Sequence, residues 1–256
     1  MPRHLILRFE APLMAFGDVM IDRIGPVRAT PAVSTVAGLL ANALGVCRWE
    51  ADRLARLQER LVMGCRLDRR GQRFTEFQTA QLEGGDRGWT TWGRVEGRTG
   101  GPATYLSPHI RSRDHDADAC VTVALRLLDD AEPPTLDDLA RALDEPARPL
   151  FLGRKAYLPA GPLGAGFLDA PTVYEALLRA PLDVGGAPRP AARRPHVDAR
   201  PLVVLPADEP CPAGFRAVRA SERRDWPAGV HAGQVVTYHG DVPRDRFASA
   251  ALEHAA

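Results

Sequence analysis

"ADACVTVALRLL", residues 117–128, is the stretch that decides how this chain folds. Apolar residues follow one another here almost without interruption, which is typical of a strand that is buried on both faces. We therefore predict a central strand over 117–128. The later segment "TLDDLARALDEP" (135–146) has the apolar spacing of a short amphipathic helix, and Thr135 is placed to cap it.

The chain before this strand begins with "HLILRFEAP" (4–12), an apolar and partly alternating segment that predicts a first strand. "STVAGLLANALG" then predicts a helix over 34–44, with Ser34 or Thr35 as its N-cap and Gly45 just beyond its C-terminus.

A second helix is predicted within "WEADRLARLQERLV" (49–62), because its leucines recur on one stripe. The following residues, 63–82, predict a hairpin of two extended segments that turns near Gly71.

The segment 83–116 has a different character, since it is rich in glycine, arginine and aromatic residues and poor in aliphatic ones. Such a segment cannot fill a core of its own. A long excursion inside a compact domain is usually functional or disordered. We expect a hairpin arm or a mobile loop.

The order of predicted elements is strand, loop, two helices, hairpin, excursion, strand and helix. This order suits an α+β fold with a ferredoxin-like (RRM-like) sheet, which is a common RNA-binding platform. We predict a ferredoxin-like domain over 1–148 and a loop-rich β portion over 149–256. The second portion is expected to hold a short helix (172–181), a proline-rich connection (188–201) and the strand candidates "LVVLP", "GFRAVRA" and "GQVVTYHG".

The composition is that of an ordinary globular protein, with 45% hydrophobic and 25% charged residues and a net charge of +1. No apolar run is long enough to span a bilayer, and no signal-peptide cleavage site follows the N-terminal apolar run, so a cytoplasmic location without a membrane partner is expected. The widely spaced cysteines predict buried free thiols rather than disulfides or a zinc site: Cys47, Cys65, Cys120 and Cys211. Arginine clusters and one acidic cluster leave two arrangements open, separate basic and acidic faces or an intermixed surface.

Candidate metal ligands gather only in "RSRDHDAD", and a solvated loop tip is the preferred interpretation of that group: Asp114, His115, Asp116 and Asp118. The chain has no nucleophile elbow, P-loop or dinucleotide fingerprint. A metal-independent ribonuclease needs a base, an acid and a cation, which His109, Tyr105 and Lys155 would provide if they converged.

Three features are suited to phosphate or nucleic acid. Gly153 precedes the cations Arg154 and Lys155 in "FLGRK", and the helix that starts near Ser34 offers N–H groups to an anion. Trp89 and Trp92 lie among arginines, a mixture that single-stranded nucleic acid favours. Each feature also has a purely structural explanation: a solvated turn, a helix cap, or an aromatic pair that fills a crevice or a protein interface.

The order of "HLILRFEAPLMAFG", "STVAGLLANALGV", "TEFQTA", "VTVALRL" and "LFLGRK" resembles the CasD family, subunits of the type I-E CRISPR surveillance complex Cascade within the RAMP superfamily. The resemblance covers roughly residues 3–165. It implies a ferredoxin-like body with a protruding β-hairpin thumb, which holds the 5′ handle of the CRISPR RNA (crRNA) and contacts the backbone subunit CasC and the large subunit. In the type I-E branch another subunit, CasE, cuts the precursor RNA, whereas in the type I-C branch a CasD relative does so.

Carried onto this sequence, the family pattern matches Phe16 and Gly17, then Ser34 and Gly38, then the turn 153–155, with the excursion 83–116 in the position of the thumb. Two positions depart from the pattern. Val33 stands where the family often has a basic residue, a role that Arg28 is a candidate to fill. Gln78 stands where the family usually has a histidine, which disfavours acid–base chemistry there.

The resemblance thus implies a non-catalytic RNA-binding subunit without a metal or cofactor. The expected RNA-binding residues are Phe16, Gly17, Arg28, Ser34, Thr35, Gly38, Trp89, Trp92, Arg94, Arg111, Arg113, Gly153, Arg154 and Lys155. Two alternatives remain open at this point: an endoribonuclease that processes precursor crRNA, and an assembly module whose arm binds only protein.

Overall fold

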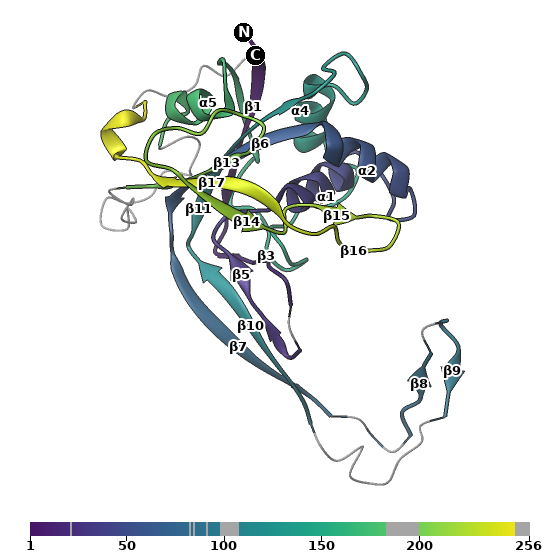
Figure 1. Cartoon of the computed structure of the whole chain (residues 1–256). Coiled ribbons are helices and arrows are strands. Elements are labelled where there is room, and N and C mark those ends of the chain that lie inside the picture. The colour runs from purple at the N-terminus through teal and green to yellow at the C-terminus, as the bar shows by residue number, and fades with distance from the viewer. Residues whose placement is uncertain are drawn as a thin grey trace.

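The computed structural model describes residues 1–20, 22–81, 83, 85–90, 92–97, 108–182 and 200–248. A body of one large sheet with helices on both faces carries a long two-stranded arm (Figure 1). The N-terminus lies at the end of the body opposite the arm (Figure 1). The fold is thus α+β, with the sheet as its main element.

The sheet has seven strands in the order β12-β1-β11-β6-β13-β17-β14, and every neighbouring pair is antiparallel. In chain order the strands are β1 (Arg3–Glu10), β6 (Leu61–Arg69), β11 (Cys120–Leu127), β12 (Gly164–Asp169), β13 (Leu202–Pro206), β14 (Arg216–Ala220) and β17 (Val235–Asp241). The predicted central strand is confirmed, because β11 lies between β1 and β6 and is buried along nearly all its length.

Helices cover the two faces of the sheet unequally. One face carries α1 (Val33–Ala43), α2 (Ala51–Arg60) and α4 (Leu136–Asp144), and the other carries α5 (Val173–Arg179) (Figure 1). Successive residues of a strand point to opposite faces. Leu5 and Leu7 of β1 accordingly join the core beneath the first three helices, while Ile6 joins the core beneath α5.

The predicted caps of the helices were confirmed for α4 but not for the N-terminus of α1. Thr135 caps α4 in a capping box, since its hydroxyl accepts from the Asp138 N–H and the Asp138 carboxylate accepts from the Thr135 N–H. α1 instead begins at Val33 with Ala32 at its N-cap and no side-chain cap, so the predicted capping role of Ser34 or Thr35 is wrong. Gly45 has the positive φ (78°) expected just beyond the end of α1.

The arm consists of β7 (Gln72–Ala80) and β10 (His109–Ala117), which pair in register from Gln72 opposite Ala117 to Ala80 opposite His109. β7 continues β6 and β10 leads into β11, so the arm prolongs two central strands of the body (Figure 1). The predicted hairpin over 63–82 is therefore wrong, because β6 and β7 belong to different sheets. Gly71 marks a bend in this ribbon rather than a hairpin turn, and a Cβ there would lie 2.3 Å from the Ala117 carbonyl oxygen.

Short strands complete the arm. β2 (Leu13–Met14) and β4 (Ile24–Gly25) pair with β10, and β3 (Phe16–Gly17) pairs with β5 (Val27–Arg28). Beyond β7 a small hairpin of β8 (Gly88–Trp89) and β9 (Val95–Glu96), which we call the hook, turns back toward the body (Figure 1). The described residues of the predicted excursion 83–116 thus belong to the outer part of an arm whose pairing begins at Gln72.

The residues after 148 add strands to both edges of the same sheet, β12 at one edge and β13, β17 and β14 at the other. Two further short strands, β15 (Arg224–Asp225) and β16 (Val230–His231), pair beside α1, and a 3-10 turn η2 spans Arg244–Arg246. The division of the chain at residue 148 stays a sequence-based prediction. The proline-rich connection 188–201 lies outside the described residues except for its last two.

The cysteines are free, but only Cys65 and Cys120 are buried, so the prediction of buried thiols is wrong for half-buried Cys47 and exposed Cys211. Burial raises the pKa of the Cys120 thiol to about 12. None of the helices in the described ranges is long and apolar enough to cross a membrane.

Candidate functional site

Five of the predicted site residues come together around one cavity of about 540 Å³: Phe16, Ser34, Thr35, Gly38 and Gly153. They belong to β3, to the first two turns of α1 and to the turn after Leu152, segments that are far apart in the sequence. The opposite wall comes from residues 221–232, which we call the strap and which carry β15 and β16. Arg224 and Trp226 of the strap line the cavity together with Arg48 and Phe151.

The N-terminus of α1 is already occupied by an internal anion. The Glu222 carboxylate accepts from the Val33 N–H (3.2 Å), and the Glu222 backbone carbonyl accepts from the Ser34 N–H (2.8 Å). Arg28 donates to the same carboxylate and to the Ser221 carbonyl. The expected free N–H groups are therefore not available for a phosphate, and the Arg28 charge is balanced by Glu222 within a buried ion pair.

Gly153 is required by the protein's own backbone. Its φ is +97°, and a Cβ there would lie 1.9 Å from the Ala15 carbonyl oxygen. The Ala15 N–H donates to the Leu152 carbonyl (3.1 Å), which seats the turn on the loop before β3. The neighbouring cations differ in their surroundings: Arg154 is half-buried among polar partners, whereas Lys155 is exposed.

Arg154 belongs to a cluster at the base of the arm that the sequence interpretation missed. The His115 side chain, 1% exposed, contacts the Tyr157 hydroxyl through Nδ1 and lies 3.1 Å from Glu76 Oε2 through Nε2. Arg154 Nη1 lies 3.1 Å from His115 Nε2 and 3.4 Å from Glu76 Oε2. Burial and the nearby Arg154 charge lower the pKa of His115, which favours the neutral ring in this cluster.

Gln78 is part of the same cluster, because its amide donates to Glu76 Oε2 (2.8 Å). This hydrogen bond is the largest cause that lowers the pKa of Glu76, with the His115 contact adding to it. Phe74 stacks on the His115 ring at 5.0 Å between centroids. A sequence signal existed in the alternation of "RFTEFQ", but only the register of β7 with β10 brings it to His115.

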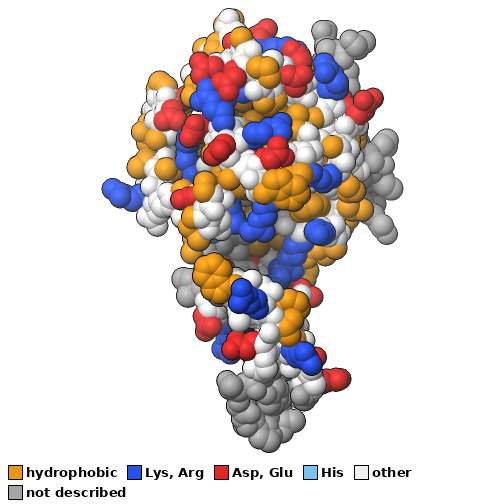
Figure 2. Space-filling view, turned by 90° about the vertical axis from the view of Figure 1, so that its right-hand side faces the viewer, with side chains coloured by type: hydrophobic (Ala, Val, Ile, Leu, Met, Phe, Trp, Pro, Cys, Tyr) orange, Lys and Arg blue, Asp and Glu red, His pale blue; other side chains and the backbone are white. Residues whose placement is uncertain are grey.

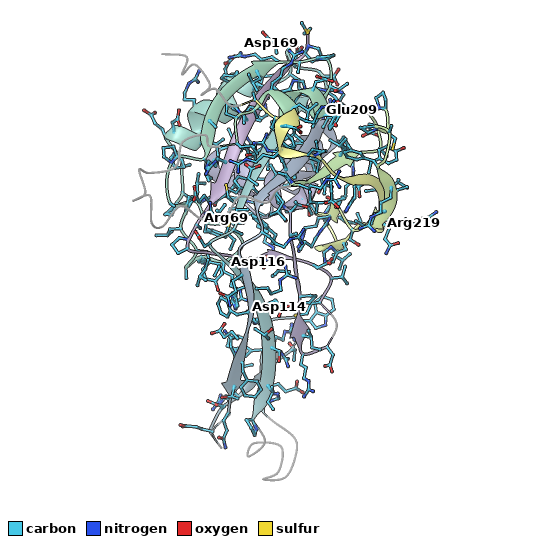
Figure 3. All side chains as sticks on the ribbon, turned by 90° about the vertical axis from the view of Figure 1, so that its left-hand side faces the viewer. Arg69, Asp114, Asp116, Asp169, Glu209 and Arg219 are labelled. Atoms are coloured by element: carbon cyan, nitrogen blue, oxygen red, sulfur yellow. The ribbon has the colours of Figure 1, made fainter. Side chains whose placement is uncertain are left out.

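The predicted solvated loop tip in "RSRDHDAD" is wrong, because these residues form β10 and the bend after it. Arg73 donates twice to Asp116 (2.9 Å each), Thr75 donates to Asp114 (2.7 Å), and Arg69 donates to the Asp118 carboxylate (2.9 Å). Figure 3 shows Arg69, Asp116 and Asp114 in succession from the body onto the arm. Within the described ranges, no group of three or more acidic, histidine or cysteine residues is arranged to hold a metal ion.

Of the hypothetical ribonuclease residues, only His109 and Lys155 lie within the described part of the chain, and the structure does not bring these two together. Tyr105 lies outside the described residues. His109 stands six residues before His115 on β10, which at about 3.3 Å per residue places it about 20 Å farther along the arm. The tyrosine that does meet a histidine is Tyr157, two residues after Lys155.

The arm is neutral rather than basic. Its described part between residues 72 and 117 has five arginines against six carboxylates: Arg73, Arg87, Arg94, Arg111 and Arg113 against Glu76, Glu83, Asp86, Glu96, Asp114 and Asp116. Trp89 and Trp92 on the hook are 71% and 88% exposed. Exposed tryptophans without an excess of positive charge fit a protein surface better than a phosphate backbone.

Charge on the body is distributed differently. Figure 2 shows Asp and Glu side chains among Lys and Arg on the upper body, while Lys and Arg side chains gather at the lower edge, above the arm. The face shown in Figure 2 is therefore intermixed in charge, with a locally basic edge. A phosphate backbone would be attracted to this edge rather than to the arm.

Comparison with known proteins gives consistent matches. Residues 4–236 match the profile of the family described as CRISPR-associated protein (Cas_Cas5). The CRISPR system Cascade subunit CasD of Escherichia coli (strain K12) is 29% identical over 181 residues, which cover 70% of this chain and 77% of that protein.

Two solved structures share the fold. A chain of a CRISPR RNA-guided surveillance complex superposes with a TM-score of 0.64 and 25% identity, covering 96% of this chain and 93% of that chain. A crystal structure of a Cas protein gives a TM-score of 0.60 and 28% identity, covering 95% and 97%.

Proposed function

The chain belongs to the CRISPR-associated Cas5 family, and from this premise we propose that it is a subunit of an RNA-guided CRISPR surveillance complex that binds the 5′ handle of crRNA. The observation that carries the proposal is the cavity beside α1. Positions that match the family pattern at Phe16, Ser34, Gly38 and Gly153 are distant in the sequence, yet they line one hollow. A shared binding site explains this convergence.

The body supports an RNA-binding role by its topology. We propose that it is ferredoxin-like, because β12, β1, β11 and β6 lie side by side in that order, with helices after β1 and after β11. In other proteins such a fold binds single-stranded RNA on an open face of its sheet. Here helices pack on both faces, so the RNA is assigned to the cavity beside α1. The basic lower edge of the body attracts the phosphate backbone.

The arm is assigned to assembly. Its neutral charge and the exposed Trp89 and Trp92 suit an apolar contact with the adjacent backbone subunit, CasC in Cascade, and the body is left to meet the large subunit. Arg94, Arg111 and Arg113 then contribute polar contacts at the rim of this interface rather than the main grip on RNA.

Lys155 offers the cleanest test of RNA binding, because it is exposed while Arg154 is held by Glu76. The affinity of the full chain for a handle RNA oligonucleotide is measured over a range of salt concentrations. The Lys155→Ala variant should reduce the slope of log affinity against log salt by about 0.7, the value for one lost phosphate contact with a single strand. Arg141→Ala, an exposed arginine on α4, is the control and should leave the slope unchanged. Equal slopes for wild type and Lys155→Ala would remove Lys155 from the RNA interface.

One observation favours a second function, an endoribonuclease. Tyr157, His115 and Glu76 form a hydrogen-bonded chain with Arg154 beside it, which is the arrangement of an acid–base relay with a cation. Labelled precursor crRNA incubated with the protein in EDTA distinguishes the two functions. Cleavage at the handle boundary that is lost in His115→Asn would establish the nuclease, and intact RNA would support the non-catalytic role.

A further inference from the structure

Two large hollows in the described part of the chain differ in charge. A cavity of about 750 Å³ beside α2 and α4 is lined by four arginines and four carboxylates: Arg53, Arg56, Arg60 and Arg141 with Asp52, Glu132, Asp138 and Glu145. The cavity of about 540 Å³ beside α1 has two arginines, Arg48 and Arg224, and no carboxylate in its lining. The nearby Glu222 is balanced by Arg28. The charge therefore selects the second cavity for a phosphate-bearing ligand.

The two arginines approach one side of this cavity together. A Cβ on Gly229 would lie 3.6 Å from Arg224 Nη2 and 4.0 Å from Arg48 Nη2, so both guanidinium groups lie around the same turn of the strap. Arg224 donates to the Gly229 carbonyl (2.5 Å), and within the described ranges neither arginine has a carboxylate partner. Their positive charge remains available to an anion at this rim.

The walls of the cavity are aromatic. Phe16, Phe151 and Trp226 line it, and the Arg224 guanidinium lies 5.6 Å from the Trp226 ring centre. The Trp226 indole Nε1 is buried and has no hydrogen-bond partner among the described residues. Because Nε1 is closed to solvent, Trp226 offers the cavity its ring surface and not its N–H group.

The strap is fixed in place as a wall. The Gln58 side chain of α2 donates to the Arg224 carbonyl and accepts from the Arg224 N–H (3.0 Å each). Glu222 fastens the start of the strap to α1. Gly38 faces this wall, since a Cβ there would lie 3.5 Å from Trp226 Cη2, which is ordinary contact. A longer side chain at 38 would extend into the cavity.

We propose that this cavity receives one unstacked nucleobase of single-stranded RNA. The base stacks against Trp226, and the adjoining phosphate lies between Arg48 and Arg224. The volume is in the range of ligand sites, and aromatic walls beside arginines are the combination that holds single-stranded bases. This assignment rests on the proposed function and gives the strap, in the C-terminal part of the chain, a direct role in it.

The experiment uses the full chain and a handle RNA oligonucleotide, with a series in which one base at a time is replaced by an abasic ribose. Fluorescence anisotropy gives the affinities. In the wild type, one abasic position should weaken binding about tenfold, in line with the stacking of one base. Gly38→Leu and Trp226→Leu should bind the unmodified RNA about tenfold more weakly and lose nothing further at that position. Arg141→Leu, which places a leucine on the exposed surface of α4 outside this cavity, is the control and should bind like the wild type.

Each outcome has a separate meaning. If Gly38→Leu and Trp226→Leu keep wild-type affinity, or if the abasic loss persists in both, the base pocket is refuted while RNA binding stands. If the wild-type chain does not bind handle RNA, the proposed function fails and the pocket assignment fails with it. Thermal unfolding of Gly38→Leu and Trp226→Leu shows that a loss of affinity reflects the cavity and not a loss of fold.

Discussion

Replacing Gly153 by alanine should destabilise the protein far more than a glycine replacement usually does. The φ of +97° alone costs a non-glycine residue about 1–2 kcal/mol. The added Cβ would meet the Ala15 carbonyl oxygen at 1.9 Å, so the turn has to move away from the loop before β3. That movement removes the hydrogen bond from Ala15 to Leu152, about 1 kcal/mol, and partly exposes Leu152, about 1–2 kcal/mol more. The total is about 3–5 kcal/mol.

Gly214 provides the matched control, because its φ is +83° and no other atom lies within 4 Å of the position that a Cβ would take. Gly214→Ala should therefore show only the conformational part, about 1–2 kcal/mol. Urea unfolding followed by circular dichroism measures both variants. In a chain of 256 residues the difference of about 2–3 kcal/mol corresponds to a gap of about 4–12 °C in Tm. If the two variants are equally stable, the contact between Gly153 and Ala15 does not determine the position of the turn.

Three further predictions concern buried side chains that can carry a charge. Burial lowers the pKa of His4 and His115 below 6.5, so the folded protein favours their neutral forms. The free energy of unfolding should be full above pH 6.5 and fall below it, by up to about 1.4 kcal/mol per pH unit for each histidine. Urea unfolding that is unchanged between about pH 8 and pH 5 would contradict this prediction. Glu222→Gln leaves Arg28 buried without a carboxylate partner and should reduce the free energy of unfolding by about 3 kcal/mol in the same assay; a loss below about 1 kcal/mol would show that the ion pair does not fasten the strap. Arg66 is fully buried and donates to the Leu177, Ala180 and Pro181 carbonyls at the end of α5. Arg66→Leu should therefore lower the free energy of unfolding by about 3–5 kcal/mol, and amide hydrogen exchange should rise first in α5.

Local patterns predicted much of the fold. The apolar run of β11 and the capping residue Thr135 depend only on neighbouring residues, and both predictions are confirmed. The hairpin prediction failed at Gly71 because a glycine between two extended segments has the same local signature whether the chain reverses or bends. The choice was decided by β10 and β11, which pair with the two segments from about 30 or more residues away.

The site shows the same limit. The family pattern indicated the residues that line the cavity from β3, α1 and the turn at Gly153. It did not indicate the strap, since Arg224 and Trp226 follow more than 190 residues after α1 begins. Glu222 was missed for the same reason, and it changes the chemistry of the α1 N-terminus. The sequence interpretation placed His115 in a solvated loop tip. Only the pairing of β7 with β10 shows that His115 and its charged neighbours are matched by Arg73, Thr75 and Glu76.

The continuity of the arm with β6 and β11 also has a mechanical consequence. An arm joined to the body by a loop could change its angle without disturbing the sheet, whereas this arm is joined through two continuous strands. Arg69 stiffens the root of the arm by donating to Glu10 and to both the carboxylate and the carbonyl of Asp118. A force that bends β7 and β10 would therefore act directly on β6 and β11 in the middle of the sheet, so the direction of the arm is coupled to the orientation of the body.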